Sequence, residues 1–452
     1  MVTFRRPRTN PQDSVLGVWA NGERVGTWSM VDGEHRFNYD ENWPASPAAR
    51  WLSLSLPFTP DNLPHRGEVV RNFFDNLLPD SDSIRRRLRD KFTTGSIEAF
   101  DLLAAIGRDC VGSVQLLPPD MAPDGFDRIE YLPLNESEVE RAINHAVTGG
   151  RVVGQELTDD FRISIAGAQE KTALLWHKDQ WCRPVGATPT THIFKLPLGL
   201  VGNMRADMSS SVENEWLCAQ ILAQLGLPVA GCEIAHFGQR KVLVVERFDR
   251  ALQQPQGRAP WIARLPQEDF CQALGVAGER KYENEGGPGI RAILRQLDNS
   301  SRADEDKQTF VSTQLAFWLM AATDGHAKNF SIFLERGGGY RMTPLYDVLS
   351  VWPIMGTGPN QLHPRRAKLA MALRSKNTHY YLHEIRTRHW QLLAQQCGVP
   401  GAFDHMVALV LQVPEALDQV EAQLPAGFPQ RVFKTIRTGM LAQAEQFIAE
   451  LP

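Results

Sequence analysis

Three polar residues in the second half of the chain have an order and spacing that suit phosphoryl transfer. Asp324 and Asn329 lie five positions apart, and Asp347 follows eighteen positions later. One short loop of this kind can present a carboxylate to an attacking hydroxyl and an amide oxygen to a metal ion on nucleotide phosphates. A second carboxylate further along would hold the same metal. The same pattern also occurs in solvated loops whose acids cap helices, so its surroundings decide its weight.

The segments on both sides of this loop are apolar. Residues 309–323 are apolar on nearly every face of a helix, which predicts a buried helix. Residues 330–334 and 340–345 alternate like two short strands, with three glycines at 337–339 as their turn. The polar loop is therefore expected between a buried helix and a hairpin, where rigid apolar elements can hold catalytic side chains.

A lysine, Lys195, lies on a strand predicted over residues 191–196. A lysine buried alone is costly, so it would need an anionic partner, as nucleotide phosphates and a helix carboxylate would provide. Glu213 and Glu215, at the start of a helix predicted over 212–225, are the available carboxylates, and we favour Glu215. The alternative is a lysine at a sheet edge that reaches water.

Two further segments could bind a nucleotide. Residues 165–172 are small and polar between two strand-like runs, so their backbone N–H groups could approach phosphates, although they hold one glycine only. Ser164 precedes them, within reach of a bound phosphate. Residues 246–248 end an apolar strand and could offer backbone groups to adenine, or could simply be a strand end.

Composition excludes several classes of protein. The 452 residues carry a net charge of −4, so no overall basic field points to nucleic acid or to an anionic membrane. The six cysteines form no Cys-x-x-Cys pair, which makes a zinc site or a disulfide framework improbable. No signal-peptide pattern opens the chain, and no apolar run approaches about 18 residues. We therefore expect a soluble, cytoplasmic protein without a membrane partner.

The order of predicted elements suggests three parts. Strands are predicted over 15–19, 24–28, 35–39 and 51–56, then helices over 69–88 and 96–106 with a loop at 80–83. Strands over 162–176, 191–196 and 241–248, with the helix between the last two, have the order of a kinase nucleotide lobe. Helices dominate after about residue 260. We expect domains at 1–155, 156–255 and 256–452.

Six motifs, taken in order, resemble the HipA family, the kinase toxins of bacterial HipBA toxin–antitoxin pairs. They read NFFDNLLPD at 72–80, DFRISIAGAQEKTALL at 160–175, TPTTHIFKLP at 188–197, VERFDR at 245–250, LPQED at 265–269 and TDGHAKNFS at 323–331. The resemblance covers nearly the whole chain. It implies an α+β fold, a protein-kinase-like two-lobed architecture with an N-terminal β-rich module and a mostly α-helical C-terminal half.

The resemblance also implies roles for individual residues. Asp324 would be the catalytic base, Asn329 and Asp347 would hold Mg²⁺, and Ser164 would be the autophosphorylated serine whose modification silences the enzyme. The expected ATP site consists of the phosphate loop Ala166, Gly167, Ala168, Gln169, Glu170 and Lys171, the lysine Lys195, the hinge Glu246, Arg247 and Phe248, and the lining residues His326, Ala327, Lys328, Asn329, Tyr346 and Asp347.

By the same resemblance, the substrate is a serine or threonine hydroxyl of a protein, glutamyl-tRNA synthetase, whose phosphorylation would arrest growth. The expected partner is a HipB-type helix-turn-helix antitoxin that holds the kinase at operator DNA. One departure limits the DNA contact: residues 375–381 contain one lysine where the family uses a lysine-rich loop, so any DNA contact should depend on the antitoxin. The alternatives are a kinase of another protein or of a small molecule, and a catalytically silent, antitoxin-binding corepressor.

Overall fold

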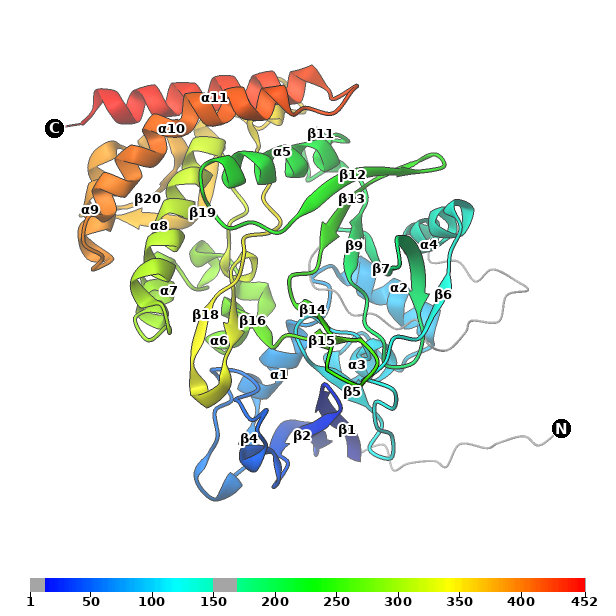
Figure 1. Ribbon diagram of the computed structural model, residues 1–452. Coiled ribbons are helices and arrows are strands. Elements are labelled where there is room, and N and C mark those ends of the chain that lie inside the picture. Colours follow the sequence, from blue (N-terminus) through cyan, green and yellow to red (C-terminus); the bar gives the residue numbers. More distant parts are fainter. Residues whose placement is uncertain (1–12, 149–168, 452) are drawn as a thin grey trace.

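The computed structural model describes residues 13–148 and 169–451 (Figure 1). An N-terminal module lies at the bottom of the view, a β lobe at the right, and a helical domain at the upper left. Ser164, Ala166, Gly167 and Ala168, which the sequence places at the phosphate loop, lie outside the described residues.

The N-terminal module is an antiparallel sheet covered by three helices. The sheet has the order β4-β3-β2-β1-β5. Its elements are β1 (Asp13–Ala20), β2 (Glu23–Val31), β3 (Glu34–Tyr39), β4 (His65–Arg66), α1 (Glu68–Asp75), α2 (Asp82–Phe92), α3 (Ala99–Ile106) and β5 (Gln115–Leu117). Trp28 of the sheet stacks on Phe74 of α1 with ring centroids 4.0 Å apart, and both side chains are fully buried. These rings join the two layers into one core.

The strand predicted over residues 51–56 does not form. An isolated bridge between Ser53 and Leu56 is its only pairing. The backbone N–H of Leu54 instead donates to Oε1 of Glu268, 2.8 Å away in the helical domain. This segment therefore joins two parts of the molecule: Leu52 and Leu56 lie in the core of the N-terminal module, and Leu54 packs against the core of the helical domain.

The β lobe is a six-stranded antiparallel sheet in the order β12-β13-β9-β7-β8-β6. Its elements are β6 (Tyr131–Pro133), α4 (Glu136–Thr148), β7 (Lys171–His177), β8 (Gln180–Pro184), β9 (His192–Lys195), α5 (Ser211–Gln224), β12 (Cys232–Phe237) and β13 (Arg240–Glu246), with a small hairpin of β10 (Gly199–Val201) and β11 (Ala206–Met208). Since β6 and α4 precede residue 155 but belong to this lobe, strand pairing places the end of the N-terminal module earlier than expected.

The helical domain contains the large core of the molecule. Its helices are α6 (Phe270–Ala273), α7 (Ile290–Leu297), α8 (Ala303–Met320), α9 (Thr387–Gln396), α10 (Ala402–Ala422) and α11 (Gln430–Ala449). Its strands are β16 (Gln267–Asp269), β17 (Ser331–Leu334), β18 (Tyr340–Met342), β19 (Lys368–Arg374) and β20 (Thr378–Tyr381), and β14 (Arg250–Gln253) pairs with β15 (Trp261–Arg264) beside the hinge.

The buried helix and hairpin predicted around the polar loop are confirmed. Every residue of α8 from Phe310 to Met320 is buried, and the helix ends where Ala321 takes a φ of 48°. The pair β17 and β18 follows the loop as expected. Within the described residues, no helix is long and apolar enough to cross a membrane. All six cysteines are free thiols.

Glu268 should make stability depend on pH. Burial raises the pKa of its carboxyl from 4.5 to about 8, so the folded protein keeps this group protonated at neutral pH. A raised folded-state pKa means that its stabilising contribution is complete below about pH 4.5 and is lost as pH rises to about 8. Relative to Glu268→Gln, wild-type protein should lose roughly 3–5 kcal/mol of unfolding free energy between pH 5 and pH 8. Urea unfolding of both proteins across this range measures it, and a constant difference would contradict it.

Candidate active site

Lys195 of β9 lies at the centre of a buried ion-pair cluster. Its Nζ donates to Oε1 of Glu215, 2.5 Å away on α5, and to Oδ1 of Asp347 at 2.9 Å. The favoured partner Glu215 is thereby confirmed, whereas Glu213 pairs with Lys241 of β13. One lysine therefore ties the sheet of the β lobe to its helix and to the segment that follows β18.

The charges of this cluster keep Asp347 ionised. Burial alone would raise its pKa, but the charges of Lys195 and Lys171 outweigh burial and lower the pKa of Asp347 to about 2. The backbone of Asp347 has a φ of 60°, a left-handed conformation that is costly for a residue with a side chain. A strained backbone at an ionised, lysine-bound carboxylate is typical of a functional site.

Asn329 lies beside Asp347 with a side-chain oxygen that is free to bind a metal ion, as far as the described residues show. It lies in a 3-10 turn, Ala327–Asn329, and its Nδ2 donates to the carbonyl of Asp347 at 3.4 Å. Its Oδ1 is buried and accepts no hydrogen bond from the residues that the structure describes. A buried acceptor without a donor is unfavourable, and a cation can satisfy it. The amide oxygen of Asn329 and the carboxylate of Asp347 therefore fit Mg²⁺, which takes one or two protein ligands and completes its shell with phosphate oxygens and water.

Asp324 lies at the start of the same loop, with a side chain that is 59% exposed. The phenol hydroxyl of Tyr282 donates to its Oδ1. His326 lies with Nε2 at 3.8 Å from the carboxylate, and burial lowers the pKa of His326 to about 3, so its ring is neutral at physiological pH. An accessible carboxylate that already accepts a hydrogen bond from one hydroxyl is well placed to accept a proton from a substrate hydroxyl.

Residues 246–248, which the sequence predicts as the hinge, lie at the end of β13. The ring of Phe248 packs against Phe333 and Tyr346, with centroids 5.8 and 5.7 Å away. The N–H of Arg247 donates to the carbonyl of Thr191, and its guanidinium is buried among other charges. Both donor groups of Arg247 are thus used inside the protein, and its contact with ATP stays a prediction.

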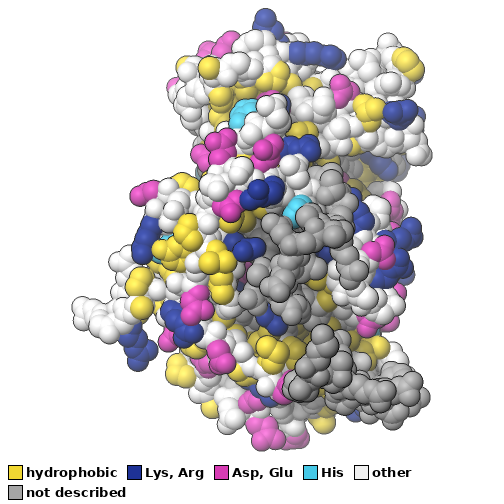
Figure 2. All heavy atoms as spheres, turned by 90° about the vertical axis from the view of Figure 1, so that its right-hand side faces the viewer, with side chains coloured by type: hydrophobic (Ala, Val, Ile, Leu, Met, Phe, Trp, Pro, Cys, Tyr) yellow, Lys and Arg dark blue, Asp and Glu magenta, His cyan; other side chains and the backbone are white. Residues whose placement is uncertain are grey.

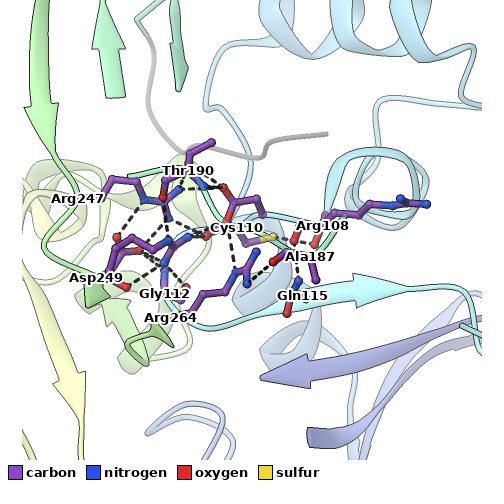
Figure 3. A network of polar contacts seen from close by, with 12 residues as sticks. Arg108, Cys110, Gly112, Gln115, Ala187, Thr190, Arg247, Asp249 and Arg264 are labelled. Atoms are coloured by element: carbon purple, nitrogen blue, oxygen red, sulfur yellow. Dashed lines mark hydrogen bonds and ion pairs between the residues drawn. The ribbon is translucent and has the colours of Figure 1, made fainter. Parts of the chain in front are cut away.

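The guanidinium of Arg247 belongs to a buried network of two carboxylates and three arginines (Figure 3). It donates to Asp249 at 2.8 Å and lies 3.4 Å from Asp109. Asp109 also receives the N–H and hydroxyl of Thr190 at 3.0 and 2.7 Å. The remaining members are Arg250, 2.9 Å from Asp109, and Arg264, 3.4 Å from Asp109. The network joins the N-terminal module to the hinge.

The described part of the phosphate loop leads into β7. The side chain of Glu170 pairs with Arg87 of α2 in the N-terminal module, and Nε2 of Gln169 donates to the carbonyl of Leu196 at 2.5 Å. Lys171 begins β7 opposite Lys195 in the register, and burial lowers its pKa to about 8. Two lysines are thus concentrated beside Asp347, where phosphates would lie.

Two other predicted lining residues have side chains committed to the protein. Nζ of Lys328 donates to Oδ1 of Asn76 at 3.0 Å and to Oδ1 of Asp80 at 2.9 Å. The hydroxyl of Tyr346 donates to the carbonyl of Lys328 at 2.8 Å. The Lys328 ammonium and the Tyr346 hydroxyl are thus bonded within the protein, and the ring of Tyr346 lies beside Phe248. Their place in the lining of the nucleotide site stays a prediction.

Sequence reasoning missed several residues that the fold brings to the site. Tyr282, Lys281 and Asp80 contact the catalytic loop or its flanks, and Asp109 and Arg264 belong to the buried network. The motif at 72–80 ends at Asp80, which was a usable signal. Asp109 lies outside all six motifs.

Family models match most of this fold. Residues 163–422 match the HipA-like C-terminal domain, which alone spans more than half of the chain, and residues 16–117 match the HipA N-terminal domain. The chain belongs to the HipA family.

Named HipA-family relatives and a solved HipA fold agree with this membership. The putative kinase Y4mE of Sinorhizobium fredii is 33% identical over 415 residues, which are 90% of this chain and 91% of the relative. The serine/threonine-protein kinase toxin HipA of Shewanella oneidensis is 25% identical, covering 88% and 89%. A chain from the solved Shewanella oneidensis MR-1 complex of HipA, HipB and operator DNA has a TM-score of 0.76 at 23% identity, covering 96% of this chain and 97% of the other.

The predicted fold class is confirmed by this HipA structure, and the chain is a protein kinase of the HipA toxin family. The roles of individual residues rest on the geometry given above.

Proposed function

We propose that this chain transfers the γ-phosphoryl group of Mg²⁺–ATP to a serine or threonine hydroxyl of a protein and acts as the toxin of a toxin–antitoxin pair. The observation that carries this proposal is the Lys195 ammonium held between Glu215 and Asp347, beside the unsatisfied Oδ1 of Asn329. That arrangement places a cation for phosphates next to two oxygen ligands for a metal. It also speaks against a silent corepressor, which would not need the cluster.

Each side chain then has one task. Lys195 binds ATP phosphates, and Asp347 and Asn329 hold Mg²⁺, which supplies neutralisation of phosphate charge. Asp324 releases the hydroxyl of Tyr282 and accepts the substrate proton as the substrate oxygen bonds to the γ-phosphorus. The bond from the γ-phosphorus to the bridging oxygen breaks, and ADP leaves with the bonding pair.

The finer assignments come from the resemblance of the sequence motifs to the HipA family. We propose glutamyl-tRNA synthetase as the substrate and growth arrest as the result of its phosphorylation. We propose Ser164 as the site of inactivating autophosphorylation, and the cytoplasm as the location of the protein. The solved relative is assembled with HipB and operator DNA, which supports a HipB-type antitoxin as partner and DNA contact through the complex. On the face shown in Figure 2, basic and acidic side chains are interspersed, which suits indirect DNA contact.

Intact-mass spectrometry of purified protein, before and after incubation with Mg²⁺ and ATP, tests kinase activity. We expect the addition of one phosphate, which maps to Ser164. No phosphate should be added when a chelator that binds Mg²⁺ is present during the incubation. A parallel incubation with glutamyl-tRNA synthetase tests the substrate. If neither protein gains phosphate while ATP binding is intact, the proposal of an active protein kinase is wrong.

Asp347→Ala should weaken Mg²⁺–ATP binding rather than act on turnover alone. The variant loses a metal ligand and leaves Lys195 paired with Glu215 only, so the affinity for ATP in the presence of Mg²⁺ should fall at least about tenfold. Calorimetric titration with and without Mg²⁺ measures the change. Equal affinities of wild type and variant in Mg²⁺ would remove Asp347 from the metal site.

A further inference from the structure

The N-terminal module contacts the loop from Asp324 to Asn329 through Asn76 and through the half-buried carboxylate of Asp80. Asp80 lies between α1 and α2, and its side chain is 16% exposed. Its Oδ1 accepts from Nζ of Lys328 at 2.9 Å, and its Oδ2 accepts from Nζ of Lys281 at 2.7 Å. Two lysines from separate segments of the helical domain therefore share one carboxylate.

These two lysines belong to the segments that surround the catalytic base. Lys328 is part of the loop from Asp324 to Asn329, next to the proposed metal ligand. Lys281 precedes Tyr282, whose hydroxyl donates to Asp324. The carbonyl of Lys281 also accepts the N–H of Ala327 at 3.3 Å. Both segments thus contact each other at the base, and Asp80 holds both.

The charges favour a fixed geometry. Burial alone would raise the pKa of Asp80, but the charges of Lys328 and Lys281 outweigh it and hold this pKa well below its usual range. Asn76 adds its Oδ1 and its carbonyl, at 3.0 and 3.2 Å, as further acceptors for Lys328. Side chains locked by several charge-assisted bonds have little freedom to move.

We propose that Asp80 is a positioning residue of the kinase reaction: from the N-terminal module, it fixes the catalytic loop and the Lys281–Tyr282 segment around Asp324. This role rests on the proposed function. It predicts that removing the charge of Asp80 lowers the rate of phosphoryl transfer in the bound complex, because a base misplaced by about 1 Å can cost roughly a hundredfold in rate.

The test compares Asp80→Asn with Asp75→Asn in the full-length protein. Asp75 lies on α1, is 18% exposed, and forms its ion pair with Arg85 at 2.8 Å inside the N-terminal module. It is therefore a carboxylate of matched exposure whose ion pair does not involve the loop from Asp324 to Asn329. Asp80→Asn should lower kcat by roughly 10- to 100-fold with KM for ATP changed less than about twofold. Asp75→Asn should keep kcat within about threefold of wild type.

A double variant separates positioning from general damage. If Asp80 acts through Lys328, the double variant Asp80→Asn, Lys328→Met should have nearly the same kcat as whichever single variant has the lower kcat. The positioning role would be overturned by equal kcat values for Asp80→Asn and Asp75→Asn. It would also be overturned if the fold-losses in kcat of the two single variants multiplied in the double variant, or if Asp80→Asn lost ATP binding. If wild type and Asp75→Asn are both inactive, the proposed function is overturned together with this role.

Discussion

Asp324→Ala should reduce phosphoryl transfer by about 10²–10⁴-fold while ATP affinity stays within about twofold of wild type. The carboxylate is exposed and accepts from Tyr282, whereas the groups proposed for the nucleotide are Lys195 and Asp347. A group used only when the substrate loses its proton contributes to the transition state and little to ground-state binding.

Single-turnover phosphorylation and calorimetric ATP titration, run on the same preparations, measure the two effects separately. Asp304→Ala is a suitable control, because Asp304 is an acid on α8 whose side chain is 75% exposed. A variant that lost ATP binding but retained turnover at saturating ATP would reverse the roles of Asp324 and Asp347.

Asp109→Ala should destabilise the protein by about 3–5 kcal/mol. Asp109 is buried and faces three arginines, Arg247, Arg250 and Arg264. Their charges outweigh burial and hold the pKa of Asp109 far below its usual range. Without this carboxylate, Asp249 is the remaining anion for two of the three arginines. Uncompensated buried charge is among the largest single-residue costs known in proteins.

Urea unfolding at pH 7 of wild type and variant measures this loss. Asp82→Ala is the matched control in the same module, because its ion pair with Arg86, at 3.3 Å, has side chains that are 59% and 68% exposed. An exposed pair of this kind should contribute less than about 1 kcal/mol. Equal losses in the two variants would show that the buried network is not important for stability.

The sequence was sufficient wherever the signal was local. Asp324, Asn329 and Asp347 have a readable spacing, and α8 is apolar on nearly every face from residue 309 onward. The start of the helix over 212–225 offered Glu213 and Glu215 as partners of Lys195, and the structure pairs Lys195 with Glu215. Each of these inferences depends on residues within one or two elements.

Features that depend on distant partners could not be read from the sequence. Asp109 and Arg247 are 138 positions apart, and the residues around Asp109 do not indicate that three arginines contact it. Arg247 and Lys328 lie in motifs of the expected ATP site, but long-range ion pairs occupy their side chains. The pattern at 51–56 alternates as a strand would, although its backbone meets Glu268 rather than a neighbouring strand.

The contacts of the N-terminal module, through Asp109 and Asp80, should affect the rate at which products leave the site. Kinase lobes commonly rotate about the hinge to admit ATP and release ADP. Here the N-terminal module contacts the hinge through Asp109 and the loop from Asp324 to Asn329 through Asp80. It therefore connects the two lobes by ion pairs outside the hinge. We expect the lobes to rotate by a small amplitude and ADP release to be slow as a result. In a protein shortened to the two lobes, these ion pairs are absent, and we expect the lobes to rotate more freely.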